Sequence, residues 1–234
     1  MNVIITGASR GIGYELVKQF AGDGAHHIYA VSRNLGNLEK LQKECFKQFP
    51  NAMVIPVGLD LSKGSEITDF AGVLTSKNVS IDVLINNAGA LVNKSFDTLT
   101  EEDFDHVFDI NVKSVFRLIQ RVKPLMKTGS HIVNISSMGG VQGSAKFNGL
   151  SVYSASKGAV AVLTEALAEE FKADGICVNC LALGAVQTEM LAEAFPGYKA
   201  PLQPTEMAQY IFSFAKNAHQ FYNGKILPVS LSTP

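Results

Sequence analysis

Tyr153 and Lys157 are four residues apart, and together they could perform acid–base chemistry. The segment around them has a helical apolar pattern. Positions i and i+4 share one helix face, so the phenol and the ammonium can reach the same ligand. A phenol with a pKa of about 10 exchanges protons poorly at neutral pH, but a neighbouring lysine cation lowers that pKa. Such a tyrosine can pass a proton to a carbonyl oxygen. The same spacing also occurs on solvated helix faces, where it has no chemical role.

Two further polar residues could join this pair. Ser137 ends an apolar strand just before the helix, so its hydroxyl would lie at the carboxyl edge of a sheet and could bind a substrate oxygen. The alternative is a loop serine that satisfies a turn. Asn111 has apolar neighbours at i−4, i−3 and i+4, namely Val107, Phe108 and Val115. A buried amide needs partners, so Asn111 is either functional or a satisfied structural asparagine.

A glycine-rich turn, TGASRGIG at Thr6–Gly13, follows the apolar run Val3–Ile5. Glycine suits a tight strand-to-helix turn because it adopts conformations that a Cβ makes costly. The free N–H groups and partial positive charge of a helix N-terminus attract a pyrophosphate. The turn therefore indicates a dinucleotide pocket, although an ordinary glycine turn would look similar.

Strand-like and helix-like segments alternate along the whole chain, which predicts one doubly wound parallel α/β sheet. We expect helices over about Thr100–Lys127, opened by a capping box at Thr100 and Asp103, and over about Ser151–Ala173. No linker or repeat is found, so we expect one domain over residues 1–234. The seven expected strands are Asn2–Thr6, His27–Ser32, Ala52–Gly58, Asp82–Asn86, His131–Ser136, Ile176–Leu183 and Lys225–Val229.

Composition limits the function classes. The 234 residues carry a formal charge of −1, which offers no basic footprint for nucleic acid. No apolar stretch reaches the ~18 residues that span a membrane, and residues 1–5 form a strand rather than a signal peptide. The cysteines Cys45, Cys177 and Cys180 predict reduced thiols in the cytoplasm. Cys177 and Cys180 have CxxC spacing without a second pair, so no metal site is expected.

Taken together, these motifs resemble the short-chain dehydrogenase/reductase family. The resemblance rests on motifs that occur in the family's order: TGASRGIG, Asp60-Leu61, NNAG at 86–89, Asn111, Ser137, and Tyr153-x-x-x-Lys157. It covers residues 6 to 157, and a weaker resemblance continues from there to the end of the chain. It implies a three-layer Rossmann-like sheet of seven strands in the order 3-2-1-4-5-6-7, and an oxidoreductase that interconverts a carbonyl and an alcohol.

The resemblance also implies roles for individual residues. Tyr153 would be the general acid/base, and Lys157 would lower its pKa and hold the nicotinamide ribose. Ser137 would position the substrate oxygen, and Asn111 would hold a water in a relay toward Lys157. The implied cofactor-binding residues are Gly7, Ser9, Arg10, Gly11, Ile12, Gly13, Ser32, Arg33, Asp60, Leu61, Asn87, Ala88, Gly89, Tyr153, Lys157, Gly184, Val186 and Thr188.

The end of the second strand predicts which nicotinamide cofactor binds. An acidic residue there would bind the ribose 2′-hydroxyl and select NAD, but this strand ends at Ser32 and Arg33. Arg33, helped by Arg10, can pair with a 2′-phosphate, so we expect NADP(H). Two exposed surface arginines are the alternative.

The chain departs from the family pattern in three places. Leu183 precedes Gly184 where most members have proline, the gap before Tyr153 is lengthened through Gly143–Leu150, and only a short lid lies between Thr188 and Pro204. A non-catalytic NAD(P)-binding regulator or redox sensor is an alternative, but such proteins tend to lose the tyrosine or lysine. An epimerase of the extended branch would need a longer chain. The small-molecule substrate stays open.

We also expect a homo-oligomer, a tetramer or a dimer. The expectation comes from the resemblance and from the two long helices. The second helix carries four small residues that would permit close helix contact, and closed symmetric assemblies are the usual result of such surfaces. These residues are Ala155, Gly158, Ala159 and Ala161.

Overall fold

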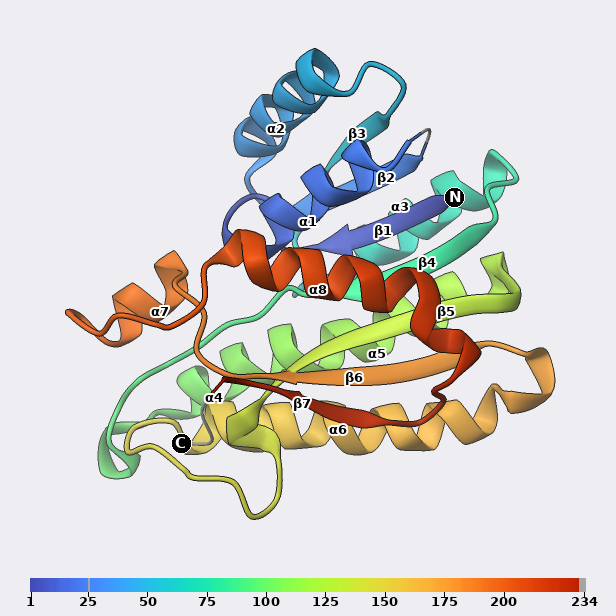
Figure 1. The fold of residues 1–234 in the computed structure, drawn as a ribbon. Coiled ribbons are helices and arrows are strands. Elements are labelled where there is room, and N and C mark those ends of the chain that lie inside the picture. Colours follow the sequence, from blue (N-terminus) through green and yellow to red (C-terminus); the bar gives the residue numbers. More distant parts are fainter. Residues whose placement is uncertain (25, 232–234) are drawn as a thin grey trace.

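A parallel sheet of seven strands forms the centre of the computed structural model, which describes residues 1–24 and 26–231. The strand order is β3-β2-β1-β4-β5-β6-β7, so the expected fold is confirmed. All strands point the same way, and their carboxyl ends lie at the left of Figure 1. The strands are β1 (Asn2–Thr6), β2 (His27–Ser32), β3 (Met53–Gly58), β4 (Ile81–Asn86), β5 (Met126–Ser137), β6 (Cys177–Leu183) and β7 (Ile226–Val229).

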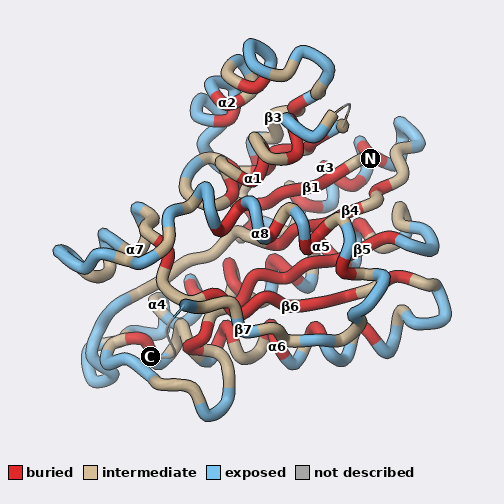
Figure 2. Tube along the Cα trace, viewed as in Figure 1, coloured by how far each residue is buried: buried red, intermediate tan, exposed pale blue. Residues whose placement is uncertain are grey.

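Helices cover both faces of the sheet, which gives the three expected layers. The alternation within β1 shows how: Val3 and Ile5 pack with apolar residues of α1, α2 and α8, whereas Ile4 packs with those of α3, α5 and α6. Figure 2 shows the buried strands between the partly exposed helices. The helices are α1 (Gly11–Gly22), α2 (Leu35–Gln48), α3 (Gly64–Ser76), α4 (Glu101–Phe108), α5 (Ser114–Val122), α6 (Ser151–Glu170), α7 (Glu189–Ala194) and α8 (Pro204–Asn217).

The expected helix over Thr100–Lys127 is wrong in two respects. A π-helical segment, Asp109–Lys113, separates α4 from α5. The helix then gives way to a short 3₁₀ turn that contains Pro124, and β5 begins at Met126, five residues before the expected start at His131. Proline lacks the N–H that would continue the α-helical ladder. Apolar periodicity alone did not indicate either feature.

The helix over Ser151–Ala173 also ends early, at Glu170. A 3₁₀ turn follows, and Gly175 then adopts a φ of 69°, a left-handed conformation that favours glycine. The other strand boundaries agree with expectation to within one residue.

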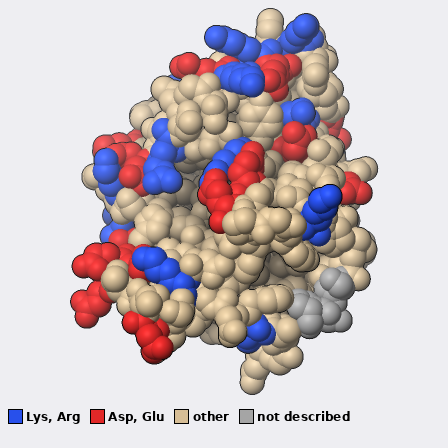
Figure 3. All heavy atoms as spheres, turned by 90° about the vertical axis from the view of Figure 1, so that its left-hand side faces the viewer, with Lys and Arg blue, Asp and Glu red and all other residues tan. Residues whose placement is uncertain are grey.

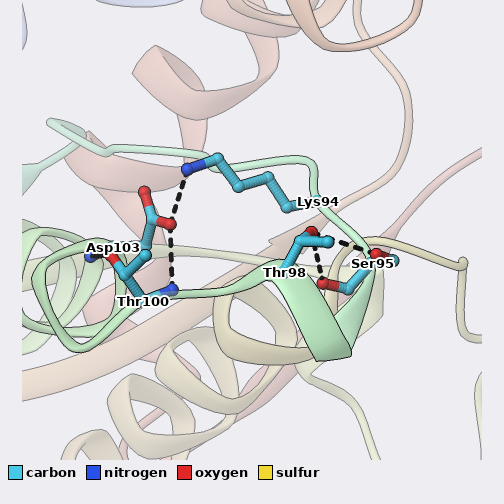
Figure 4. Close-up of polar contacts among 5 residues, drawn as sticks. All are labelled: Lys94, Ser95, Thr98, Thr100 and Asp103. Carbon is cyan, nitrogen blue, oxygen red and sulfur yellow. Dashed lines mark hydrogen bonds and ion pairs between the residues drawn. The ribbon is translucent and has the colours of Figure 1, made fainter.

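The predicted capping box opens α4. Asp103 N–H donates to Thr100 Oγ1, and Thr100 N–H donates to Asp103 Oδ2, each over 3.1 Å. Lys94 Nζ also donates to Asp103 Oδ2 over 2.6 Å, and Thr98 Oγ1 donates to the Ser95 carbonyl over 3.0 Å (Figure 4). These contacts fix the segment after β4 against the start of the helix that leads to Asn111.

Candidate active site

The predicted site residues gather at the carboxyl ends of the strands. All of them except Gly13 and Asn111 line one cavity of about 660 Å³. Figure 3 looks onto this end of the molecule and shows a hollowed, largely uncharged area with charged side chains around it. The fold therefore brings together residues from both halves of the sequence, from Gly7 to Thr188.

Tyr153 and Lys157 project from the first turns of α6 beside the end of β5. Lys157 Nζ lies 5.8 Å from the centroid of the Tyr153 ring. The ammonium donates to the Ile135 carbonyl over 2.9 Å, and the side chain is only 4% exposed. Ser137 is the last residue of β5, and its Oγ accepts from Gly139 N–H over 3.2 Å. Ser136 anchors α6 from the neighbouring position, because its hydroxyl donates to the Lys157 carbonyl over 2.7 Å.

Burial dominates the electrostatics of this pair. Burial raises the pKa of the Tyr153 phenol above its ordinary value, and a hydrogen bond with Ser137 only partly opposes that rise. Burial also lowers the pKa of Lys157 to about 8. A raised pKa favours the protonated phenol, the form that can donate a proton. The lowering of the Tyr153 pKa by Lys157 stays a prediction.

Asn111 lies at the centre of the π-helical segment and is 1% exposed. Its Oδ1 accepts from Ala90 N–H over 2.7 Å, and its Nδ2 donates to the Ala90 carbonyl and to Ser156 Oγ, each over 2.9 Å. Ser156 Oγ in turn donates to the Tyr153 carbonyl over 2.7 Å. Asn111 therefore clamps the segment after β4 to α6, which makes it a positioning residue. Its role in holding a water stays a prediction.

Two glycines of the glycine-rich turn, Gly7 and Gly13, are packed so closely that a side chain would not fit. Gly7 and Gly11 have φ values of 68° and 58°. A Cβ on Gly13 would overlap the Gly7 carbonyl oxygen, and a Cβ on Gly7 would lie 2.8 Å from Ala88 Cα. Thr6 Oγ1 ties the turn to the segment after β4 by accepting from the N–H groups of Asn87 and Ala88, each over 3.0 Å. This cradle fits the close backbone approach of a pyrophosphate.

Ser32 and Arg33 lie where β2 ends, at the end of the cavity beside the glycine-rich turn. Ser32 Oγ donates to Ser9 Oγ over 2.8 Å. Burial acts to raise the pKa of Asp60, but hydrogen bonds from Ser62 and the charge of Arg33 leave it below its usual value. Arg10 lines the same cavity, and its Nη1 forms an exposed ion pair with Glu193 Oε1 of α7 over 2.8 Å. Its contribution to binding a 2′-phosphate stays a prediction.

The lid after Thr188 contains the short helix α7. Thr188 Oγ1 caps it by accepting from Leu191 N–H over 3.2 Å. Two contacts hold the helix over the cavity: the Arg10–Glu193 ion pair and a 2.8 Å hydrogen bond from Asn93 Nδ2 to the Ala194 carbonyl. Sequence reasoning missed Asn93 and Glu193. No local signal marks them, because the partner of Asn93 is 101 residues away and that of Glu193 is 183 residues away.

The residue in place of the family's proline, Leu183, is a regular buried strand residue paired with Ser137 and Val229. Gly184 N–H donates to the Val229 carbonyl over 2.9 Å, and a Cβ on Gly184 would overlap Ser230. The loop at this end of the cavity is therefore fixed against β7.

The described residues hold neither a cluster of metal ligands nor a membrane-spanning helix. They contain no group of three or more His, Cys, Asp or Glu side chains that could hold a metal ion. None of their helices is both long and apolar enough to cross a membrane. Cys45, Cys177 and Cys180 all carry free thiols.

Comparison with known proteins gives matches over most of the chain. A family model described as short chain dehydrogenase matches residues 1–199. A 3alpha-hydroxysteroid dehydrogenase of Mediterraneibacter gnavus is 31% identical over 97% of this chain and 94% of that protein. A 3-oxoacyl-[acyl-carrier-protein] reductase FabG of Thermotoga maritima is 33% identical over the same shares. A solved Serratia marcescens short-chain dehydrogenase/reductase mutant superposes with a TM-score of 0.85 at 26% identity, covering 98% of this chain and 96% of that one.

Proposed function

Because the chain belongs to the short-chain dehydrogenase family, we propose that it is an NADP(H)-dependent oxidoreductase that interconverts a ketone or aldehyde and an alcohol. Residues 1–234 would form one cofactor-binding domain. The observation that carries the proposal is the joint presence, in one cavity, of the Tyr153–Lys157 pair, Ser137 and the glycine cradle. A nicotinamide cofactor, when bound, supplies the hydride.

The chain's own residues would handle the proton and the substrate oxygen. Tyr153 would donate its proton to the alkoxide oxygen that develops as the carbonyl is reduced. Its raised pKa suits this direction, because the phenol stays protonated until a strong base forms beside it. Ser137 would hold the same oxygen by a hydrogen bond. Lys157, whose pKa is about 8, would remain largely cationic at pH 7 and stabilise the negative charge left on the phenol.

The cradle and the segment after β4 would hold the cofactor. The backbone N–H groups at the start of α1 would bind the pyrophosphate, and Asn87, Ala88 and Gly89 line the cavity opposite them. Lys157 would hold the ribose of the nicotinamide half. The Gly184–Thr188 segment would contact the nicotinamide.

The preference for NADP(H) rests on Ser32 and Arg33, which take the place of an acidic residue at the end of β2. A 2′-phosphate paired with Arg33 gains a charge-assisted hydrogen bond of ~1.5–3 kcal/mol. Arg33→Ala should therefore weaken NADPH binding by at least ten-fold and leave NADH binding nearly unchanged, as measured by calorimetric titration. Tighter binding of NADH than of NADPH to the unchanged protein contradicts this preference.

The proposed chemistry is tested by Tyr153→Phe. Acid–base catalysis of this kind contributes ~10²–10⁴-fold, so kcat for a carbonyl substrate should fall by about that factor. NADPH affinity should stay within a few-fold, because only the hydroxyl is removed. Tyr210→Phe, on α8 and 43% exposed, is the matched control. A Tyr153→Phe variant that keeps full turnover contradicts the proposal.

We also propose that the chain forms a homo-oligomer. Large apolar side chains are exposed on the helices of one sheet face: Phe104 on α4, Phe116 on α5 and Val162 on α6. The small residues of α6 support the idea less than expected. Ala161 is buried within the chain and so is not available to a partner, whereas Gly158 is half-buried. A monomeric mass in light scattering at micromolar concentration contradicts the assembly.

A further inference from the structure

The cavity is lined by charged residues toward one end and by apolar residues toward the other. Its charged residues lie toward the glycine turn and the end of β2: Arg33 follows β2, and Glu189 approaches Gly11, with Oε2 3.5 Å from the position of a Cβ there. At the other end, apolar side chains adjoin the proposed catalytic residues. Met138 follows Ser137, Leu150 precedes α6, and Ile110 precedes Asn111.

The lid and two loops complete this apolar wall. Leu91 follows Ala90, to which Asn111 is bonded, and Phe195 comes from the segment after α7. Phe147 and Tyr198, which are 49% and 50% exposed, also line the cavity. Among the described residues that line the cavity, the side chains at this end that could carry positive charge are the buried Lys157 and the exposed His106 on α4. Lys146, exposed beside Phe147, donates to the Val141 and Ser144 carbonyls of its own loop.

The surface beside this end is acidic. Glu101, Glu102 and Asp105 are exposed on α4, and His106 lies directly after them. Among the described neighbours in this segment, Lys94 is already paired with Asp103. A negatively charged substrate would therefore approach against like charge and then leave water for an apolar wall without a dedicated cation.

We infer that this protein acts on uncharged, predominantly apolar ketones or secondary alcohols and discriminates against those that carry a carboxylate or are joined to an acidic carrier. The inference rests on the proposed function and narrows its substrate. The preference for uncharged substrates arises from the apolar wall formed by the 138–150 loop, the π-helical segment and the lid. The carboxylates of α4 add to it by repelling negative charge.

A matched substrate pair tests the inference. Methyl 7-oxooctanoate and 7-oxooctanoate present the same ketone, and only the second carries a charge, which is far from the carbonyl. NADPH oxidation at pH 7.5 should give a kcat/KM at least ten-fold higher for the ester. Calorimetric titration of both compounds into the NADP⁺-loaded chain gives binding without chemistry, and the ester should bind at least ten-fold more tightly.

The two readouts separate the two claims. If the ester binds more tightly but neither compound is turned over, the proposed function fails, whereas the selection of uncharged ligands by the cavity stands. If the carboxylate binds as tightly as the ester, or the ester does not bind, the inference is overturned. It is also overturned if the carboxylate is preferred and His106→Gln removes that preference.

A charge variant tests the part assigned to α4. Glu101→Gln with Glu102→Gln should raise kcat/KM for the carboxylate by about three-fold and leave the ester unchanged, with the difference shrinking in high salt. The matched control is Glu169→Gln with Glu170→Gln, at the far end of α6. An equal gain in the control pair removes the assignment to α4.

Discussion

Acid should destabilise this protein through His131, a buried histidine of strand β5. It is 1% exposed on β5 and paired in register with β4 and β6. Its Nδ1 lies 3.0 Å from the Ala215 carbonyl, and its Nε2 lies 3.0 Å from Asn179 Nδ2. The carbonyl requires a proton on Nδ1, and the amide donor requires a bare Nε2. The neutral ring with its proton on Nδ1 satisfies both contacts.

The pKa of His131 is lowered from its ordinary value of 6.5 to about 4, mainly because the ring is buried. The nearby His219 also lowers this pKa, whereas the hydrogen bond to the Ala215 carbonyl raises it. The folded state thus resists a proton that the unfolded state accepts. The neutral ring's contribution is fully present above pH 6.5 and is lost as the pH falls toward 4. The complete shift corresponds to a loss of about 3 kcal/mol in the free energy of unfolding. About 2 kcal/mol of this is lost between pH 8 and pH 5.

The assay is urea unfolding at a fixed protein concentration, at several pH values between 8 and 5. His131→Gln removes the titrating ring. Between pH 8 and pH 5 the free energy of unfolding of this variant should therefore fall by about 2 kcal/mol less than that of the unchanged chain. At pH 8 the variant should be the less stable of the two. His27→Gln, at the exposed start of β2, is the matched control and should keep the full dependence. The reasoning is refuted if His131→Gln and the unchanged chain show the same dependence on pH.

Three further changes should act through contacts described above. Gly13→Ala should abolish NADPH binding in calorimetry, because the Cβ would overlap the Gly7 carbonyl; Gly72→Ala, with nothing within 4 Å of its Cβ, should bind normally. Asn111→Ala should lower the free energy of unfolding by about 1–3 kcal/mol and reduce kcat at least ten-fold, and unchanged kinetics would contradict its positioning role. Thr100→Ala should cost about 1 kcal/mol in urea unfolding through the lost cap of α4, and no change would show the cap to be dispensable.

The sequence predicted most of the fold because its signals are local. Nearly continuous apolar runs indicate strands covered on both faces, and all seven strands were found, with β5 longer than expected. The strand order came from the family resemblance and was confirmed. The interruption between α4 and α5 was not predicted, because a π-helical segment keeps an apolar face much like that of a continuous helix. Its stabilising contacts, from Asn111 to Ala90 and Ser156, are distant in sequence.

The candidate site was also predictable in outline. Strand ends meet at one edge of a parallel sheet, so Ser137, Arg33 and the glycine turn had to lie at the same end. Their partners could not be read from the sequence. Arg10, for example, pairs with Glu193, 183 residues away, because the lid folds back over the glycine turn.

The residue types and their order determined the sheet and the glycine-rich turn, and they predicted Tyr153 and Lys157 as an acid–base pair. These depend on backbone geometry and periodicity within a few residues. The tertiary structure alone decided the burial that shifts the pKa values of Tyr153 and Lys157, the contacts of Asn111, and the apolar side chains at one end of the cavity. The physical reason is that burial and partner contacts set a side chain's pKa, and both are supplied by elements far apart in the chain.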